Sequence, residues 1–157
     1  PTPSSAASDV YKRQVCDIAV SLDNIKLALT EAKLGLIPAT ISPYVILKVG
    51  SSNAIDMFTS ARTFSPQEGQ KIGLIKSFTT SDKIDNTITN EILPFLKNAP
   101  AALSASKKLV RNLSVKIDEN TIRFTVEALA DVWENPEAIE GINAFFEKRK
   151  PNWLMEK

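Results

Sequence analysis

The sequence contains no histidine and a single cysteine. The absence of histidine removes the usual base of nucleophilic triads and the commonest metal ligand, so no metal site is expected. One cysteine excludes a disulfide within the chain. Because Cys16 lies in the apolar run 15–20, we expect it to be a buried, unreactive thiol. Acid or base catalysis must therefore use a carboxylate, a lysine or a tyrosine.

The charges are nearly balanced, since 19 lysines and arginines accompany 18 aspartates and glutamates. A net charge of +1 gives no general field for phosphate backbones, so nucleic acid is not an expected partner. No apolar run approaches the roughly 18 residues of a membrane span, and no charged head precedes an apolar segment near the start. We therefore expect no membrane partner and no signal peptide, and a location in the cytoplasm or an organelle matrix.

Residues 1–14 form a leader rich in serine, alanine and proline, with no hydrophobic periodicity. We expect this leader to be disordered, because it has little apolar surface to bury. It also resembles a non-native leader, which suggests that the true coding sequence is cut just before Val15.

Residues 15–80 combine short apolar runs with helical patterns and read as the core of an α/β fold. The expected elements are strands at 15–20, 25–29 and 74–78, a helix from Pro38 to Gly50, and a helix capped by Ser51 or Ser52. The run Ser65-Pro66-Gln67-Glu68 matches a capping box, and Gly73 should end that short helix.

Residues 81–157 are predicted to be a helical C-terminal region. Isoleucines recur every four residues from Ile84 to Ile92 and predict a helix that Pro94 should kink or end. Further helices are expected from Pro100, after a cap at Asp118, and from Asn135-Pro136 to about Lys150. In the third of these four helices, Ile122, Val126, Leu129 and Trp133 share one apolar face.

Glu31 is the candidate catalytic residue. It lies between an apolar strand and a helix that opens on proline, where a carboxylate is held firmly and still reached by substrate. The alternative is an ordinary solvated charge or a helix cap, which is the commoner role of a carboxylate at a strand end.

The last predicted helix carries a second candidate site. On a helical wheel Gly141, Phe145 and Lys148 share a face that could hold an adenine ring and a phosphate. Alternatively, Phe145 packs against a neighbouring helix or subunit, and Lys148-Arg149-Lys150 complements the dipole at the helix C-terminus.

Four segments resemble motifs of the crotonase, or enoyl-CoA hydratase/isomerase, superfamily. The resemblance rests on VCDIAVS at 15–21, LTEAKLGLIP at 29–38, FSPQEGQKIGLI at 64–75 and EGINAFFEKRKP at 140–151. They occur in the family's order and cover nearly everything after Gln14.

The resemblance implies the C-terminal part of a crotonase-type ββα spiral, followed by a helical region used for trimer or hexamer formation. It implies an enzyme of acyl-CoA thioesters, in which coenzyme A is part of the substrate and no cofactor is needed. Glu31 matches the second of two catalytic glutamates; the first, and both oxyanion-hole donors, lie upstream of the segments present here. Binding contacts are implied for Leu34, Gly35, Pro38, Phe145 and Lys148, whereas Leu129 replaces an aromatic residue of the adenine pocket.

The segment after Pro38 resembles hydratases of methylglutaconyl-CoA and related branched acyl-CoA substrates, and Pro43 and Tyr44 could shape the acyl pocket. Three functional interpretations follow. The first is a fragment of an enoyl-CoA hydratase of fatty acid or branched-chain amino acid metabolism. The second is a double-bond isomerase, and the third is that the chain as given is a catalytically inactive remnant.

Overall fold

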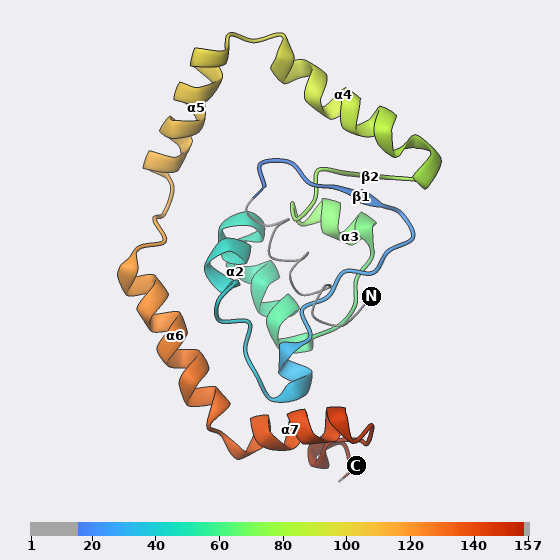
Figure 1. The fold of residues 1–157 in the computed structure, drawn as a ribbon, viewed down its shortest axis with the longest axis vertical. Coiled ribbons are helices and arrows are strands. Elements are labelled where there is room, and N and C mark those ends of the chain that lie inside the picture. The colour runs from blue at the N-terminus through green and yellow to red at the C-terminus, as the bar shows by residue number, and fades with distance from the viewer. Residues whose placement is uncertain (1–15, 156–157) are drawn as a thin grey trace. The chain divides into compact units, whose positions relative to one another are not determined.

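The computed structural model describes residues 16–155, and these form two compact units. The first unit comprises 16–26 and Ser65–Asp118, and the second comprises Leu27–Phe64 and Glu119 onward. Figure 1 gives the order of their elements along the chain. The predicted leader 1–14 lies outside the described residues.

A two-stranded parallel sheet lies in the first unit. Strand β1, Val20–Leu22, pairs with β2, Ser77–Thr79, and Val20 is in register with Ser77. Both strands lie later in the sequence than predicted, because an apolar run marks where the chain is buried and not where its hydrogen-bonded ladder forms. The expectation of a buried Cys16 is wrong, since this residue precedes β1 and is exposed.

Helix α3, Pro66–Lys71, begins with the predicted capping box. The Ser65 side chain accepts a hydrogen bond from the Glu68 N–H at 3.3 Å, and the Glu68 carboxylate accepts one from the Ser65 N–H at 2.9 Å. Pro66, at the first helical position, is almost completely buried. The local sequence therefore determines how this helix begins.

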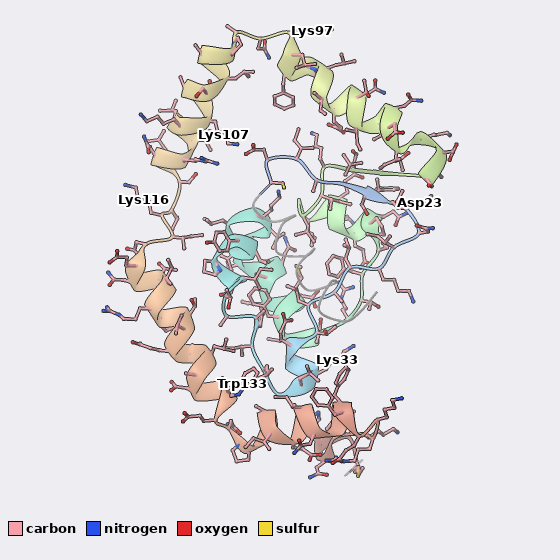
Figure 2. All side chains as sticks on the ribbon, viewed as in Figure 1. Asp23, Lys33, Lys97, Lys107, Lys116 and Trp133 are labelled. Atoms are coloured by element: carbon pink, nitrogen blue, oxygen red, sulfur yellow. The ribbon has the colours of Figure 1, made fainter. Side chains whose placement is uncertain are left out.

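Two longer helices complete the first unit. After η2, Ser81–Lys83, helix α4 spans Ile84–Leu96 and α5 spans Pro100–Leu113. Pro94 lies within the last turn of α4. Lys107, labelled in Figure 2, donates from α5 to the carboxylate of Asp17.

Helix α2, Ser42–Ser60, provides the core of the second unit. Gly50 interrupts its helical geometry with φ 77°, so the expected break at this glycine is confirmed. The buried side chains of α2 are Val45, Val49, Ala54 and Met57. Leu27, before α2 in the sequence, and Phe64, after it, form a single antiparallel bridge. A full strand at 25–29 was predicted. Leu27 and Leu29 are buried nevertheless, so the alternation correctly indicated burial.

The C-terminal part of the second unit consists of α6, Glu119–Trp133, α7, Pro136–Phe146, and η3, Asn152–Leu154. The Asn135 side chain accepts a hydrogen bond from the Glu137 N–H at 3.0 Å and caps α7. α7 packs against η1, Glu31–Leu34, and against α6.

Candidate active site

Glu31 opens the short helix η1, whose backbone is closed by local hydrogen bonds. The Thr30 carbonyl accepts from the Lys33 N–H at 3.0 Å, and the Glu31 carbonyl accepts from the Leu36 N–H at 3.1 Å. Lys33, labelled in Figure 2, is exposed on the same turn. These bonds hold the backbone of Glu31 in a defined turn, although it lies in a connection and not in a long helix.

Two glycines allow η1 to approach α7 closely. Gly35 caps η1 with φ 68°, and a Cβ at this position would lie 2.6 Å from the Glu137 carbonyl oxygen. A Cβ on Gly141 would lie 2.5 Å from the Leu34 carbonyl carbon. Real Cβ atoms do not come this close to backbone, so both positions require glycine in this packing.

The side chain of Glu31 is half-buried, and its Oε2 atom is fully buried without a hydrogen-bond partner. Burial of an unpaired polar atom is costly, and a buried carboxylate oxygen is normally hydrogen-bonded. No hydrogen bond within the described residues accounts for the burial of this oxygen. The atom is suited to accept a proton from, or donate one to, a molecule that enters the site.

The other predicted contacts of this loop differ in accessibility. Leu34 and Gly35 are half-buried, whereas Pro38 is buried. The Pro38 carbonyl accepts a hydrogen bond from the Ser42 N–H at 2.9 Å, which leads the chain into α2. Pro38 thus shapes the backbone between Glu31 and α2.

The second candidate site lies at the end of α7, which ends at Phe146 and not near Lys150 as predicted. Phe145 is exposed. Its ring lies edge to face with the ring of Phe146, and the two ring centroids are 5.7 Å apart. Lys148 is exposed beyond the helix with φ 54°. Gly141 is buried, so it does not share an open face with Phe145 and Lys148.

An apolar groove of about 370 Å³ lies in the second unit and was not predicted. Its lining residues are Thr40, Val126, Leu129, Ala130, Trp133 and Glu134. Val126 and Trp133, the latter labelled in Figure 2, are more than half exposed. The apolar stripe of α6 was the available signal, but periodicity does not distinguish a face that lines a groove from one that enters a core.

Among residues 16–155, no group of three or more histidine, cysteine, aspartate or glutamate side chains is arranged to hold a metal ion. Within the same range, none of the helices combines the length and apolar character needed to cross a bilayer.

Comparison with known proteins identifies the family. The sequence model described as enoyl-CoA hydratase/isomerase matches residues 13–156. The chain is 29% identical to mouse mitochondrial methylglutaconyl-CoA hydratase over 99% of its own length and 54% of that protein. It is 28% identical to Escherichia coli 2,3-dehydroadipyl-CoA hydratase over 88% of its length and 55% of that protein. The chain thus spans about half the length of these curated relatives.

A solved structure agrees with the sequence comparison. An enoyl-CoA hydratase from Mycobacterium avium superposes with a TM-score of 0.81 at 32% identity, over 94% of this chain and 58% of that one. The predicted fold class, part of a crotonase-type fold with a helical C-terminal region, is confirmed. The chain belongs to the enoyl-CoA hydratase/isomerase family.

Proposed function

We propose that this chain supplies an acid/base carboxylate, Glu31, to an enoyl-CoA hydratase that adds water across the double bond of an enoyl-CoA thioester. The observation that supports this proposal is the buried, unpartnered Oε2 of Glu31. Within 16–155 it is the carboxylate oxygen that is both buried and without a hydrogen-bond partner. A carboxylate oxygen without a partner in the protein has its lone pairs available for a proton of the substrate.

In the proposed reaction, Glu31 holds one of the protons that move when water adds to the conjugated double bond. The resemblance assigns the other glutamate and the two oxyanion-hole N–H groups to residues upstream of Val15. Loss of one such donor costs about 2.7–4 kcal/mol of transition-state stabilisation. We therefore expect residues 1–157 alone to be inactive and the longer parent protein to be active.

Coenzyme A enters this proposal as part of the substrate, without a separate cofactor. Phe145 offers an exposed aromatic face for adenine, and the ammonium group of Lys148 pairs with a phosphate. Leu34, Gly35 and Pro38 define the loop that brings the thioester to Glu31. Both groups of residues lie in the second unit.

The acyl group is proposed to be branched, as in methylglutaconyl-CoA. Pro43 lies in the first turn of α2, and the neighbouring Tyr44 is partly exposed. The mouse relative, named for this substrate, supports the same choice. Comparing the complete enzyme on methylglutaconyl-CoA and crotonyl-CoA tests it, and a clear preference for crotonyl-CoA would contradict it.

The parent protein is proposed to assemble as a trimer, or as a hexamer of two trimers, in the cytoplasm or an organelle matrix. Large apolar side chains are exposed on several helices, and examples are Leu96 of α4, Leu113 of α5 and Phe124 of α6. Such surfaces favour contact with other protein. Sedimentation of the complete protein tests the assembly, and a monomer would contradict it.

A double-bond isomerase is the second candidate. A single carboxylate can carry a proton from one carbon of the acyl chain to another. Among the carboxylates of residues 16–155, Glu31 has the buried oxygen without a hydrogen-bond partner. Product analysis with a 3-enoyl-CoA and a 2-enoyl-CoA separates the two reactions, since only a hydratase forms the hydroxyacyl product.

The decisive experiment compares Glu31→Gln with Glu127→Gln, an exposed carboxylate on α6, in the complete enzyme. Loss of the conjugated enoyl absorbance reports hydration. Glu31→Gln should lower kcat by about 10²- to 10⁴-fold, since this is the usual contribution of general acid–base catalysis. Glu127→Gln should leave kcat unchanged. Equal activity of the two variants would reject the proposed role of Glu31.

A further inference from the structure

The chain reverses direction after α7 through a specific turn. The Lys148 N–H donates to the Phe145 carbonyl at 3.3 Å, and the Arg149 N–H donates to the Ala144 carbonyl at 3.0 Å. This pair of bonds is the Schellman motif that ends many helices. Lys148 occupies its left-handed position, with φ 54°.

A lysine is unusual at this position. Glycine is the common residue there, because a Cβ disfavours the left-handed conformation. Among residues 16–155, Ala61 and Lys148 are the two non-glycine residues with positive φ. A strained residue of this kind suggests a functional requirement for its side chain.

A network of hydrogen bonds fixes the residues that follow Lys148. The Glu140 carboxylate accepts two bonds from the Arg149 guanidinium, at 2.5 and 2.8 Å, and a third from the Asn152 N–H at 2.9 Å. Glu147 accepts from Arg149 Nε at 2.6 Å. Paired bonds between guanidinium and carboxylate fix orientation as well as distance. We call Glu140, Arg149 and Asn152 the Glu140 clamp.

The clamp engages Arg149 and leaves Lys148 and Lys150 as the exposed lysines of this turn. Arg149 is engaged by two carboxylates, and its hydrogen bonds hold the pKa of Glu140 below the ordinary value. Lys148 is exposed, and no carboxylate of the described residues lies within ion-pair distance of it. Of these two lysines, Lys148 holds the left-handed position, so its ammonium group is the one whose placement depends most directly on this turn.

We propose that Glu140 is a positioning residue for coenzyme A binding: the Glu140 clamp holds the strained turn so that Lys148 points its ammonium group at a phosphate of the substrate. The inference rests on the proposed function, which assigns that phosphate to Lys148. Glu140 itself touches no substrate and acts through Arg149 and the backbone of the turn.

Removal of Glu140 should affect phosphate binding in opposite directions, depending on whether Glu140 acts by charge or by positioning. Loss of a carboxylate near Lys148 makes the turn more positive, which should tighten phosphate binding. Loss of the clamp frees the turn to relax from its strained conformation, which should weaken binding. The sign of the change in Glu140→Gln thus separates positioning from simple electrostatics. Glu147→Gln is the matched control, since it also removes one negative charge beside Arg149 but leaves the three hydrogen bonds of the Glu140 carboxylate in place.

The experiment measures coenzyme A binding by calorimetry, with the complete parent protein carrying Lys148→Gly, Glu140→Gln or Glu147→Gln. Lys148→Gly retains the turn and removes the ammonium, so it should weaken binding by about 10- to 100-fold. Glu140→Gln should weaken it by about three- to tenfold, whereas Glu147→Gln should match the wild type or bind slightly more tightly. The double variant Lys148→Gly/Glu140→Gln should bind no more weakly than Lys148→Gly, because the clamp acts through Lys148.

The outcomes distinguish the phosphate contact of Lys148 from the positioning role of Glu140. If Lys148→Gly binds coenzyme A as the wild type does, or if the wild type does not bind it, the phosphate contact of the proposed function is wrong and this inference fails with it. If Lys148→Gly is weakened but Glu140→Gln behaves as Glu147→Gln, the phosphate contact holds and the positioning role is wrong. Additive losses in the double variant would also reject positioning through Lys148.

Discussion

Gly141 of α7 lies against the backbone of Leu34 in η1, so closely that a Cβ on Gly141 would come within 2.5 Å of the Leu34 carbonyl carbon. Gly35 makes the reciprocal approach toward the Glu137 carbonyl. Two family motifs, distant in sequence, thus interlock through their glycines. The turn that carries Glu31 is supported by α7, and the position of the candidate carboxylate depends on that contact.

Replacing Gly141 with alanine should destabilise the second unit and displace η1. The added Cβ meets backbone atoms, which cannot rotate away as a side chain can, so we expect a loss of about 1–3 kcal/mol in the free energy of unfolding. Denaturant unfolding measures it. Asn143→Ala, at an exposed position of the same helix, should change stability by no more than about 0.5 kcal/mol. Equal stability of the two variants would contradict the close packing.

Gly50→Ala tests backbone strain in isolation from packing. Gly50 interrupts α2 with φ 77° and ψ 161°, and a Cβ there would meet no atom within 4 Å. This conformation is accessible almost only to glycine, so alanine should cost about 1–3 kcal/mol in spite of the open space. Thermal unfolding measures the change. An unaltered or raised Tm would show that α2 can become straight at no cost.

The Glu140 clamp should make stability depend on pH in the acidic range. The Arg149 hydrogen bonds lower the pKa of Glu140 from its ordinary value of 4.5. The unfolded chain therefore binds a proton at higher pH than the folded chain, and the stabilisation present above pH 4.5 is lost as pH falls through the lowered pKa. The difference in Tm between wild type and Glu140→Gln should be largest near neutral pH and vanish in acid. A difference independent of pH would rule out the ionised clamp.

Local signals in the sequence predicted local structure well. The capping box at Ser65 and Glu68 is confirmed because its hydrogen bonds join residues three positions apart. The break of α2 at Gly50 and the cap of α7 at Asn135 follow for the same reason. The strands were less predictable, because pairing between β1 and β2 depends on residues far apart in sequence.

For the candidate site, the sequence nominates residues but does not determine their geometry. A motif identified Glu31, whereas the burial of its Oε2 atom depends on packing that no local pattern encodes. The end of α7 was predicted too late, because the sequence offers lysine where a stop signal normally has glycine. Hydrogen bonds from Arg149 to Glu140, nine residues earlier, accompany this unusual end.

The stability of the Glu31→Gln variant distinguishes a catalytic carboxylate from a structural one without an activity assay. The unpartnered Oε2 of Glu31 loses hydration on burial and gains no hydrogen bond in return, so Glu31→Gln should leave the free energy of unfolding unchanged or raise it. Glu68 is the contrasting case, because its carboxylate accepts a hydrogen bond from the Ser65 N–H and caps α3. Glu68→Ala should therefore lower stability by about 1 kcal/mol. Unfolding in denaturant provides both values. A clear loss of stability in Glu31→Gln would mean that Glu31 maintains the fold, and its burial would then no longer argue for proton transfer.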